Sequence, residues 1–205
     1  MRGVMDLNQH SKLLVQQVRE NWELLGYETR NKYQFLDEAQ NPIGYAAEQQ
    51  KGFLGFMMRQ FLGHWRTFDL HFFDQGRNEY MIAKHPFCFL FQRLEVQDIN
   101  GQKIGSLQQR FSLITKKFDV LDAHGNVIME MRSPIWKPWT YPFYSRGQEV
   151  ACVLKKFSGL FSEIFTDRDN FAIDLKSQAL TIDEKKIILA TSVFIDLVYF
   201  EKKAN

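Results

Sequence analysis

The chain has 205 residues, of which 24% are charged and 45% are hydrophobic, and its formal net charge at pH 7 is +2. This balance is typical of one folded domain and excludes a disordered or collagen-like chain. So small a net charge provides no bulk attraction to nucleic acid. The Lys-Lys pairs in the sequence are too short, as runs of positive charge, to form a polybasic arm. Aromatic residues reach 15%, with 19 Phe, which suits tightly filled β structure and equally a lipid-facing surface.

Residues 6–25 place apolar side chains at three- and four-residue intervals, which predicts an amphipathic helix that ends at Gly26. The side chains that form this apolar face are Leu7, Leu14, Val15, Val18, Trp22 and Leu25. Residues 1–30 are therefore expected to form an N-terminal helix or arm that precedes the main domain.

The expected location of the protein follows from its N-terminus and its cysteines. The first 25 residues lack the uninterrupted apolar stretch and the cleavage site of a signal peptide. Cys88 and Cys152 are far apart and have no partner motif, as in a reduced intracellular protein. We therefore expect a cytoplasmic protein that is not secreted.

From Tyr33 the pattern changes to short apolar runs that are separated by turn residues, which predicts β-strands. Residues 98–101 and 122–125 share an Asp-x-x-Gly turn, and residues 74–76 form a shorter relative. Asp accepts local backbone hydrogen bonds and Gly supplies a positive φ, so both residues suit hairpins. We predict a mainly β protein, an antiparallel sheet of about eight or more strands, closed because closure removes exposed edges.

Residues 53–65 carry a second apolar pattern. Read as a helix, this segment places Phe53, Met57, Phe61 and Trp65 on one face, opposite Arg59 and Gln60. Such a helix contacts a membrane surface or a partner protein, so these four residues are candidate lipid contacts. A lid packed across the mouth of the barrel explains the pattern equally well.

Residues 133–147 mix aromatic side chains with prolines. Pro134, Pro138 and Pro142 predict a loop or an irregular edge, because proline is excluded from central strands. Trp136, Trp139 and Tyr141 suit the headgroup level of a bilayer, and they are the second group of candidate lipid contacts. A loop folded onto its own barrel is the alternative.

The last apolar segment, residues 187–200, is interrupted only by Thr191, Ser192 and Asp196, and Thr181 and Asp183 are possible caps before it. A helix that is apolar on all faces is buried in protein or in lipid. Fourteen residues rise only about 21 Å, against about 30 Å of hydrocarbon, and Asp196 is costly in lipid. A core helix inside the barrel is therefore favoured over a membrane span.

Several stretches together resemble one known family. They include NKYQFLDEAQNPIGYAAEQ, GQEVACVLKKFSGL, GLFSEIFTDRDNFAIDL and the terminal VFIDLVYFE. The chain resembles the phospholipid scramblases, which belong with the tubby-like and LURP-one-related proteins. The resemblance implies a closed antiparallel barrel of twelve strands over residues 31–203, around a hydrophobic helix at about 182–201. It also implies ATP-independent movement of phospholipids between leaflets at the cytoplasmic membrane face.

A calcium site is implied by the same resemblance, in a loop that begins at Asp167. Asp169, Phe171 and Ile173 would take the third, fifth and seventh positions. A calcium loop normally has Gly sixth and a bidentate carboxylate twelfth, but this chain has Ala172 and Gln178 there. We expect weak Ca²⁺ binding at most. The alternative is a turn at the aspartates followed by a strand with alternating inward side chains.

Two functions remain open from the sequence. The first is a phospholipid scramblase, peripheral at the inner face of the plasma membrane. The second is a soluble tubby-like barrel that binds a lipid headgroup, an acyl chain or a protein partner without transport. A nucleic-acid partner is not expected. The sequence lacks the motifs of hydrolases, metalloproteases and phosphate-binding enzymes, so no bond-making activity is predicted.

Overall fold

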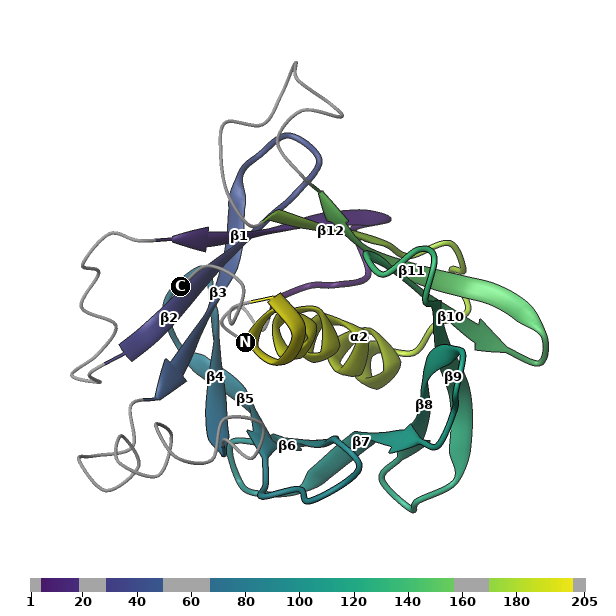
Figure 1. The fold of residues 1–205 in the computed structure, drawn as a ribbon. Coiled ribbons are helices and arrows are strands. Elements are labelled where there is room, and N and C mark those ends of the chain that lie inside the picture. Colours follow the sequence, from purple (N-terminus) through teal and green to yellow (C-terminus); the bar gives the residue numbers. More distant parts are fainter. Residues whose placement is uncertain (1–4, 19–28, 50–66, 157–169, 201–205) are drawn as a thin grey trace.

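The computed structural model describes residues 5–18, 29–49, 67–156 and 170–200. Twelve antiparallel strands form a closed barrel, and one helical segment runs through its centre (Figure 1). The strands are β1 (Lys12–Val18), β2 (Thr29–Leu36), β3 (Pro42–Gln49), β4 (Phe68–Asp74), β5 (Glu79–His85), β6 (Arg93–Asp98), β7 (Lys103–Arg110), β8 (Thr115–Asp122), β9 (Val127–Pro134), β10 (Thr140–Ser145), β11 (Gln148–Lys156) and β12 (Asn170–Asp174). The central segment is α2 (Ile182–Ile195), continued as the π-helix η2 (Asp196–Phe200). The predicted closed barrel around a C-terminal helix is confirmed.

The prediction of a helix over residues 6–25 is wrong for its described part, residues 6–18. Residues 12–18 form β1, which pairs with β12 on one side and β2 on the other and so closes the barrel. Leu13 and Val15 are buried two positions apart, which is the period of a strand. Without β1, strands β2 and β12 would both keep an unpaired edge, and closure outweighs the local helical spacing. Residues 19–28 lie outside the described part of the chain.

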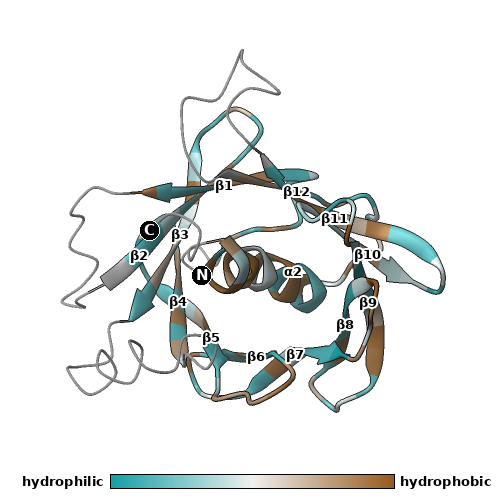
Figure 2. Cartoon of the chain, viewed as in Figure 1, coloured by the Kyte–Doolittle hydropathy of each residue, from teal (hydrophilic) through white to brown (hydrophobic). Residues whose placement is uncertain are grey.

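The central helix is buried on nearly all sides, and Figure 2 shows apolar residues along α2 inside the ring of strands. Its start is fixed by a capping box, in which Thr181 and Glu184 satisfy each other's backbone N–H groups. The hydroxyls of Thr191 and Ser192 donate to the carbonyls of Ile187 and Leu189, both at 2.7 Å. These internal hydrogen bonds explain why two polar residues are tolerated in the core.

The barrel has two chemically different ends. Connections β2–β3, β4–β5, β6–β7, β8–β9 and β10–β11 lie at one end, which we call the turn end, because successive strands are antiparallel. The described β5–β6, β7–β8 and β9–β10 connections lie at the opposite end, which we call the loop end. Lys185, in the first turn of α2, donates to the carbonyl of Leu7 and the side chain of Asn8, just before β1. The helix therefore enters at the turn end, and η2 lies toward the loop end.

Four hairpins at the turn end share one feature, an aspartate whose side chain accepts a hydrogen bond from a backbone N–H of its own turn. Asp98 Oδ1 accepts from Asn100 and Gln102, and Asp122 Oδ1 accepts from His124 and Asn126. Gly101 and Gly125 adopt φ of 81° and 88°, as the Asp-x-x-Gly pattern predicts. Asp37 Oδ1 accepts from Ala39 and Asn41 in the same way, and Asp74 Oδ1 accepts from Asn78, but these turns have Gln40 and Arg77 in the left-handed conformation.

These turns predict a loss of stability in acid. Hydrogen bonds from Asn41 and from Asn126 lower the pKa of Asp37 and of Asp122 below the ordinary value of 3.8. A carboxyl whose pKa is lowered by folding stabilises the protein above its unfolded pKa, and this stability is lost as the pH falls through the folded pKa. We expect the melting temperature of Asp37→Asn/Asp122→Asn to change less than that of the wild type between pH 7 and pH 3. An identical change in both proteins would contradict the prediction.

Strands β9 and β10 form a short seam in the wall. Their register contains only Phe143 opposite Met131 and Tyr144 opposite Glu130. Pro142 interrupts this ladder because it has no N–H to donate. The predicted loop over residues 133–147 is therefore corrected in part, since Pro134 ends β9 and Pro142 lies within β10. A groove of about 1110 Å³ is lined by residues of both strands and of the connection from β12 to α2.

Candidate functional site

The loop end carries an exposed apolar surface. Of the twelve large hydrophobic side chains that are exposed in the described part of the chain, ten lie on three connections at this end. We call them the apolar rim: Phe87, Phe89, Leu90 and Phe91 on β5–β6, Phe111, Leu113 and Ile114 on β7–β8, and Ile135, Trp136 and Trp139 on β9–β10. Such a concentration of apolar side chains on one end of a domain marks a membrane or protein contact.

The structure separates the candidate lipid contacts into three groups. Trp136 and Trp139 are 69% and 44% exposed and belong to the apolar rim. Tyr141 points into the barrel and is fully buried, and its hydroxyl donates a hydrogen bond to the carbonyl of Pro138. Phe53, Met57, Phe61 and Trp65 lie outside the described residues.

Sequence reasoning missed eight members of the apolar rim, the seven on the β5–β6 and β7–β8 connections and Ile135 on β9–β10. The available signal was the pair of apolar runs HPFCFLFQR and RFSLIT, which lack the Asp and Gly residues of the Asp-x-x-Gly turns. Each run reads locally as a piece of strand. Only the strand order places both runs beside Trp136 and Trp139 at one end.

The proposed calcium loop falls partly outside the described residues, since Asp167 and Asp169 are among those whose placement is not described. Phe171 and Ile173 lie in β12, where both side chains point inward and are 0% and 1% exposed. Each is paired with β1 on one side and with β11 on the other. Within the described part of the chain, no three His, Cys, Asp or Glu side chains gather as metal ligands would.

Polar side chains line the inside of the barrel below the apolar rim. Asp196, at the junction of α2 and η2, accepts hydrogen bonds from Lys155 Nζ at 2.9 Å and from the Tyr33 hydroxyl at 2.8 Å. All three side chains are buried. The Lys155 ammonium also lies 4.2 Å from the ring centre of Phe200 and 4.9 Å from that of Phe171. This ion pair joins the C-terminal part of the helix to the wall.

A second lysine on the wall, Lys116, also points into the barrel and contacts η2. Lys116 lies on the face of β8 that carries Phe118 and Val120, both fully buried, because side chains alternate along a strand. Its Nζ is 3.7 Å from the ring centre of Tyr199 and 5.8 Å from that of Tyr141.

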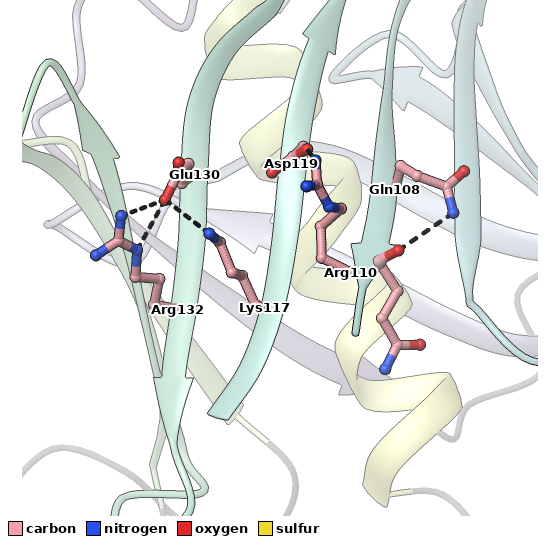
Figure 3. Close-up of polar contacts among 7 residues, drawn as sticks. Gln108, Arg110, Lys117, Asp119, Glu130 and Arg132 are labelled. Atoms are coloured by element: carbon pink, nitrogen blue, oxygen red, sulfur yellow. Dashed lines mark hydrogen bonds and ion pairs between the residues drawn. The ribbon is translucent and has the colours of Figure 1, made fainter. Parts of the chain in front are cut away.

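On the outer face of β7, β8 and β9, charged side chains form ion pairs with one another (Figure 3). Arg110 on β7 pairs with Asp119 on β8 at 2.5 Å, and Glu130 on β9 pairs with both Lys117 and Arg132. Hydrogen bonds from Arg132 and the nearby positive charges lower the pKa of Glu130, which keeps it ionised at neutral pH. The side chain of Lys117 therefore points outward to Glu130, whereas that of its neighbour Lys116 points inward to the ring of Tyr199.

Comparison with known proteins identifies the family. Residues 2–202 match the sequence profile of the family named Scramblase, which covers nearly the whole chain. The chain belongs to the scramblase family. It is 28% identical to phospholipid scramblase 1 of Mus musculus over 99% of this chain and 65% of that protein. It is 22% identical to a phospholipid scramblase family protein of Schizosaccharomyces pombe over 87% of this chain and 56% of that protein. The chain thus spans less than two thirds of the length of these two relatives.

A known structure supports the fold of this scramblase family member. An Arabidopsis thaliana protein solved by X-ray crystallography superposes with a TM-score of 0.52 and 11% identity, over 96% of this chain and 98% of that one. At such low identity the likeness concerns the fold alone. Among the described helices, none is long and apolar enough to cross a bilayer.

Proposed function

We propose that this protein docks on a phospholipid bilayer through the apolar rim. The observation that carries the proposal is the placement of ten exposed apolar side chains on neighbouring connections of one barrel end. Tryptophans at the edge of this rim suit the interface between headgroups and acyl chains. Lys137, an exposed residue between the two rim tryptophans, adds attraction to anionic lipids.

Membership of the scramblase family supports a second step, ATP-independent movement of phospholipids between leaflets at the docked surface. We place this activity at the cytoplasmic face of the plasma membrane. The central helix stays inside the barrel during docking, since leaving would expose its buried surface and the Lys155–Asp196 pair. Calcium acts at most as a weak regulator, through Asp167 and Asp169, because Ala172 and Gln178 do not suit a calcium loop.

Removing the rim tryptophans should weaken membrane binding. Two aromatic side chains that each gain about 1 kcal/mol on partial burial predict a loss of roughly thirtyfold in vesicle affinity for Trp136→Ser/Trp139→Ser. Co-sedimentation with phosphatidylcholine vesicles measures this affinity. The matched control is Ile99→Ser/Val127→Ser, which removes two large apolar side chains that are 57% and 54% exposed at the turn end of the described barrel. Equal affinities of the two double variants would overturn docking through the rim.

The same proteins test lipid movement separately. Labelled phospholipid should cross faster in vesicles that carry the wild-type protein than in empty vesicles, and the Trp136→Ser/Trp139→Ser variant should abolish the difference. Docking with no acceleration in any vesicle would reject transport while leaving the membrane contact intact. That outcome would favour a barrel that binds lipid without moving it.

A further inference from the structure

The groove beside β9 starts next to the apolar rim. This groove of about 1110 Å³, which we call the seam groove, is lined by residues of β9, of β10 and of the connection from β12 to α2. Toward the loop end its lining includes Thr115 and Pro134, which lie opposite each other in the β8–β9 register. Their neighbours in the chain, Ile114 and Ile135, are members of the apolar rim. The seam groove is therefore continuous with the apolar rim.

The order of the charges along the seam groove matches a zwitterionic headgroup. Arg132 lies two residues before Pro134, and Glu130 two residues before Arg132, so the three side chains share one face of β9 at intervals of about 7 Å. From the rim, the groove presents a positive charge and then a negative one (Figure 3). In a phospholipid the phosphate lies beside the glycerol and the amine lies at the far end. A lipid held at the rim by its acyl chains therefore meets these charges in the complementary order.

An aromatic ring lies beside the negative charge. Tyr144 is opposite Glu130 in the β9–β10 register, and both side chains line the seam groove. Aromatic ring faces bind quaternary ammonium groups, and a carboxylate next to the ring adds charge attraction. The Arg132 guanidinium occupies a position of this kind, since it lies 5.8 Å from the ring centre of Tyr144 and its Nε donates to Glu130 Oε2 at 2.8 Å. A headgroup amine can take the same position while Arg132 turns to the phosphate.

We propose that the seam groove binds the zwitterionic headgroup of a membrane phospholipid, with its phosphate on Arg132 and its ammonium between Glu130 and the ring of Tyr144. This inference rests on the proposed docking through the apolar rim, which holds the acyl chains. Separating Glu130 from Arg132 costs little, because both side chains are partly exposed and each receives a new partner from the headgroup. The site therefore favours headgroups with both charges over headgroups with the phosphate alone.

The test measures binding to vesicles of phosphatidylcholine and of phosphatidylglycerol, whose headgroup has the phosphate but no amine. Glu130→Gln and Tyr144→Leu should each weaken binding to phosphatidylcholine about fivefold and leave binding to phosphatidylglycerol within about twofold. Tyr144→Phe keeps the ring and should bind phosphatidylcholine as the wild type does. The matched control is Glu95→Gln, which makes the same change in a half-exposed ion pair with Arg93 on β6, outside the groove, and it should leave both affinities within about twofold.

Two further measurements test the phosphate contact and the headgroup itself. Arg132→Gln should weaken binding to phosphatidylcholine about threefold, whereas Arg110→Gln, which removes the same charge from the outer face outside the groove, should change it by less than about twofold. Soluble glycerophosphocholine should lower the vesicle affinity of the wild type toward that of Glu130→Gln, and it should not change the affinity of that variant. Thermal melting establishes that each variant is folded.

The outcomes separate the headgroup site from the docking surface. Equal losses in Glu130→Gln and Glu95→Gln would assign the effect to net charge and overturn the site. A loss for Glu130→Gln that is the same on both lipids would also overturn it, since the carboxylate would then not recognise the amine. If Trp136→Ser/Trp139→Ser binds like the wild type, docking through the rim fails, and the site fails with it. If the tryptophans are required but Glu130→Gln binds phosphatidylcholine like the wild type, only the headgroup site fails.

Discussion

Asp196→Ala should lower the free energy of unfolding by about 3–5 kcal/mol, because it removes the carboxylate that neutralises a buried lysine. Lys155 is 6% exposed and Asp196 is 2% exposed, so neither charge is compensated by bulk water. The substitution also removes the acceptor of the Tyr33 hydroxyl, which is buried inside the barrel. Urea denaturation of the wild type and the variant measures the difference.

Two companion variants give this prediction its controls. Glu149→Ala breaks the exposed pair of Lys176 and Glu149, which are joined at 2.6 Å on the surface, and should cost less than about 1 kcal/mol. Lys155→Met/Asp196→Leu removes both buried charges and should recover much of the stability lost in Asp196→Ala. An Asp196→Ala variant within 1 kcal/mol of the wild type, roughly the cost of a surface pair, would contradict the role given to the pair.

Phe194→Ala should also cost about 3–5 kcal/mol, because it leaves a cavity at the centre of the barrel. The ring of Phe194 is fully buried, and its centre lies 6.4 Å from Phe68, 6.2 Å from Phe118 and 5.4 Å from His85. These neighbours lie on strands that pair all round a closed wall, so the wall cannot collapse onto the missing ring. Urea denaturation of the variant gives the magnitude.

The matched control for this cavity is Phe111→Ala, the same chemical change at a side chain that is 74% exposed on the apolar rim. Its cost should stay below about 0.5 kcal/mol. Similar losses for the two variants would mean that the helix is not packed in the barrel as described. The two alanine variants also separate folding from docking, since only Phe111→Ala should weaken vesicle binding without destabilising the chain.

Features that depend on a few neighbouring residues were predictable from the sequence. The Asp-x-x-Gly turns at 98–101 and 122–125 form as expected, because the aspartate oxygen and the glycine φ act within one turn. The buried helix was also predictable, since a segment that is apolar all round has no solvent face. The alternation of Phe171 and Ile173 correctly indicated a strand before that helix.

Features that depend on distant partners were not predictable. Residues 12–18 have a spacing that fits a helix, but closure of the barrel makes them a strand between β2 and β12. Tyrosine is a residue type that suits a lipid interface, yet the position of Tyr141 in β10 directs its side chain into the core. The apolar rim is spread over three separate connections, and only the strand order brings them to one end.

The sequence by itself determined the closed barrel, its polar turns and the helix that fills it, because these follow from local turn chemistry and from the burial of apolar runs. Only the tertiary structure decided which side chains form the candidate site. Lys116 and Lys117 are adjacent and identical in sequence, but the register of β8 points the first toward the ring of Tyr199 inside the barrel and the second toward Glu130 outside. Their different environments come from pairing between strands, and pairing is a property of the whole sheet.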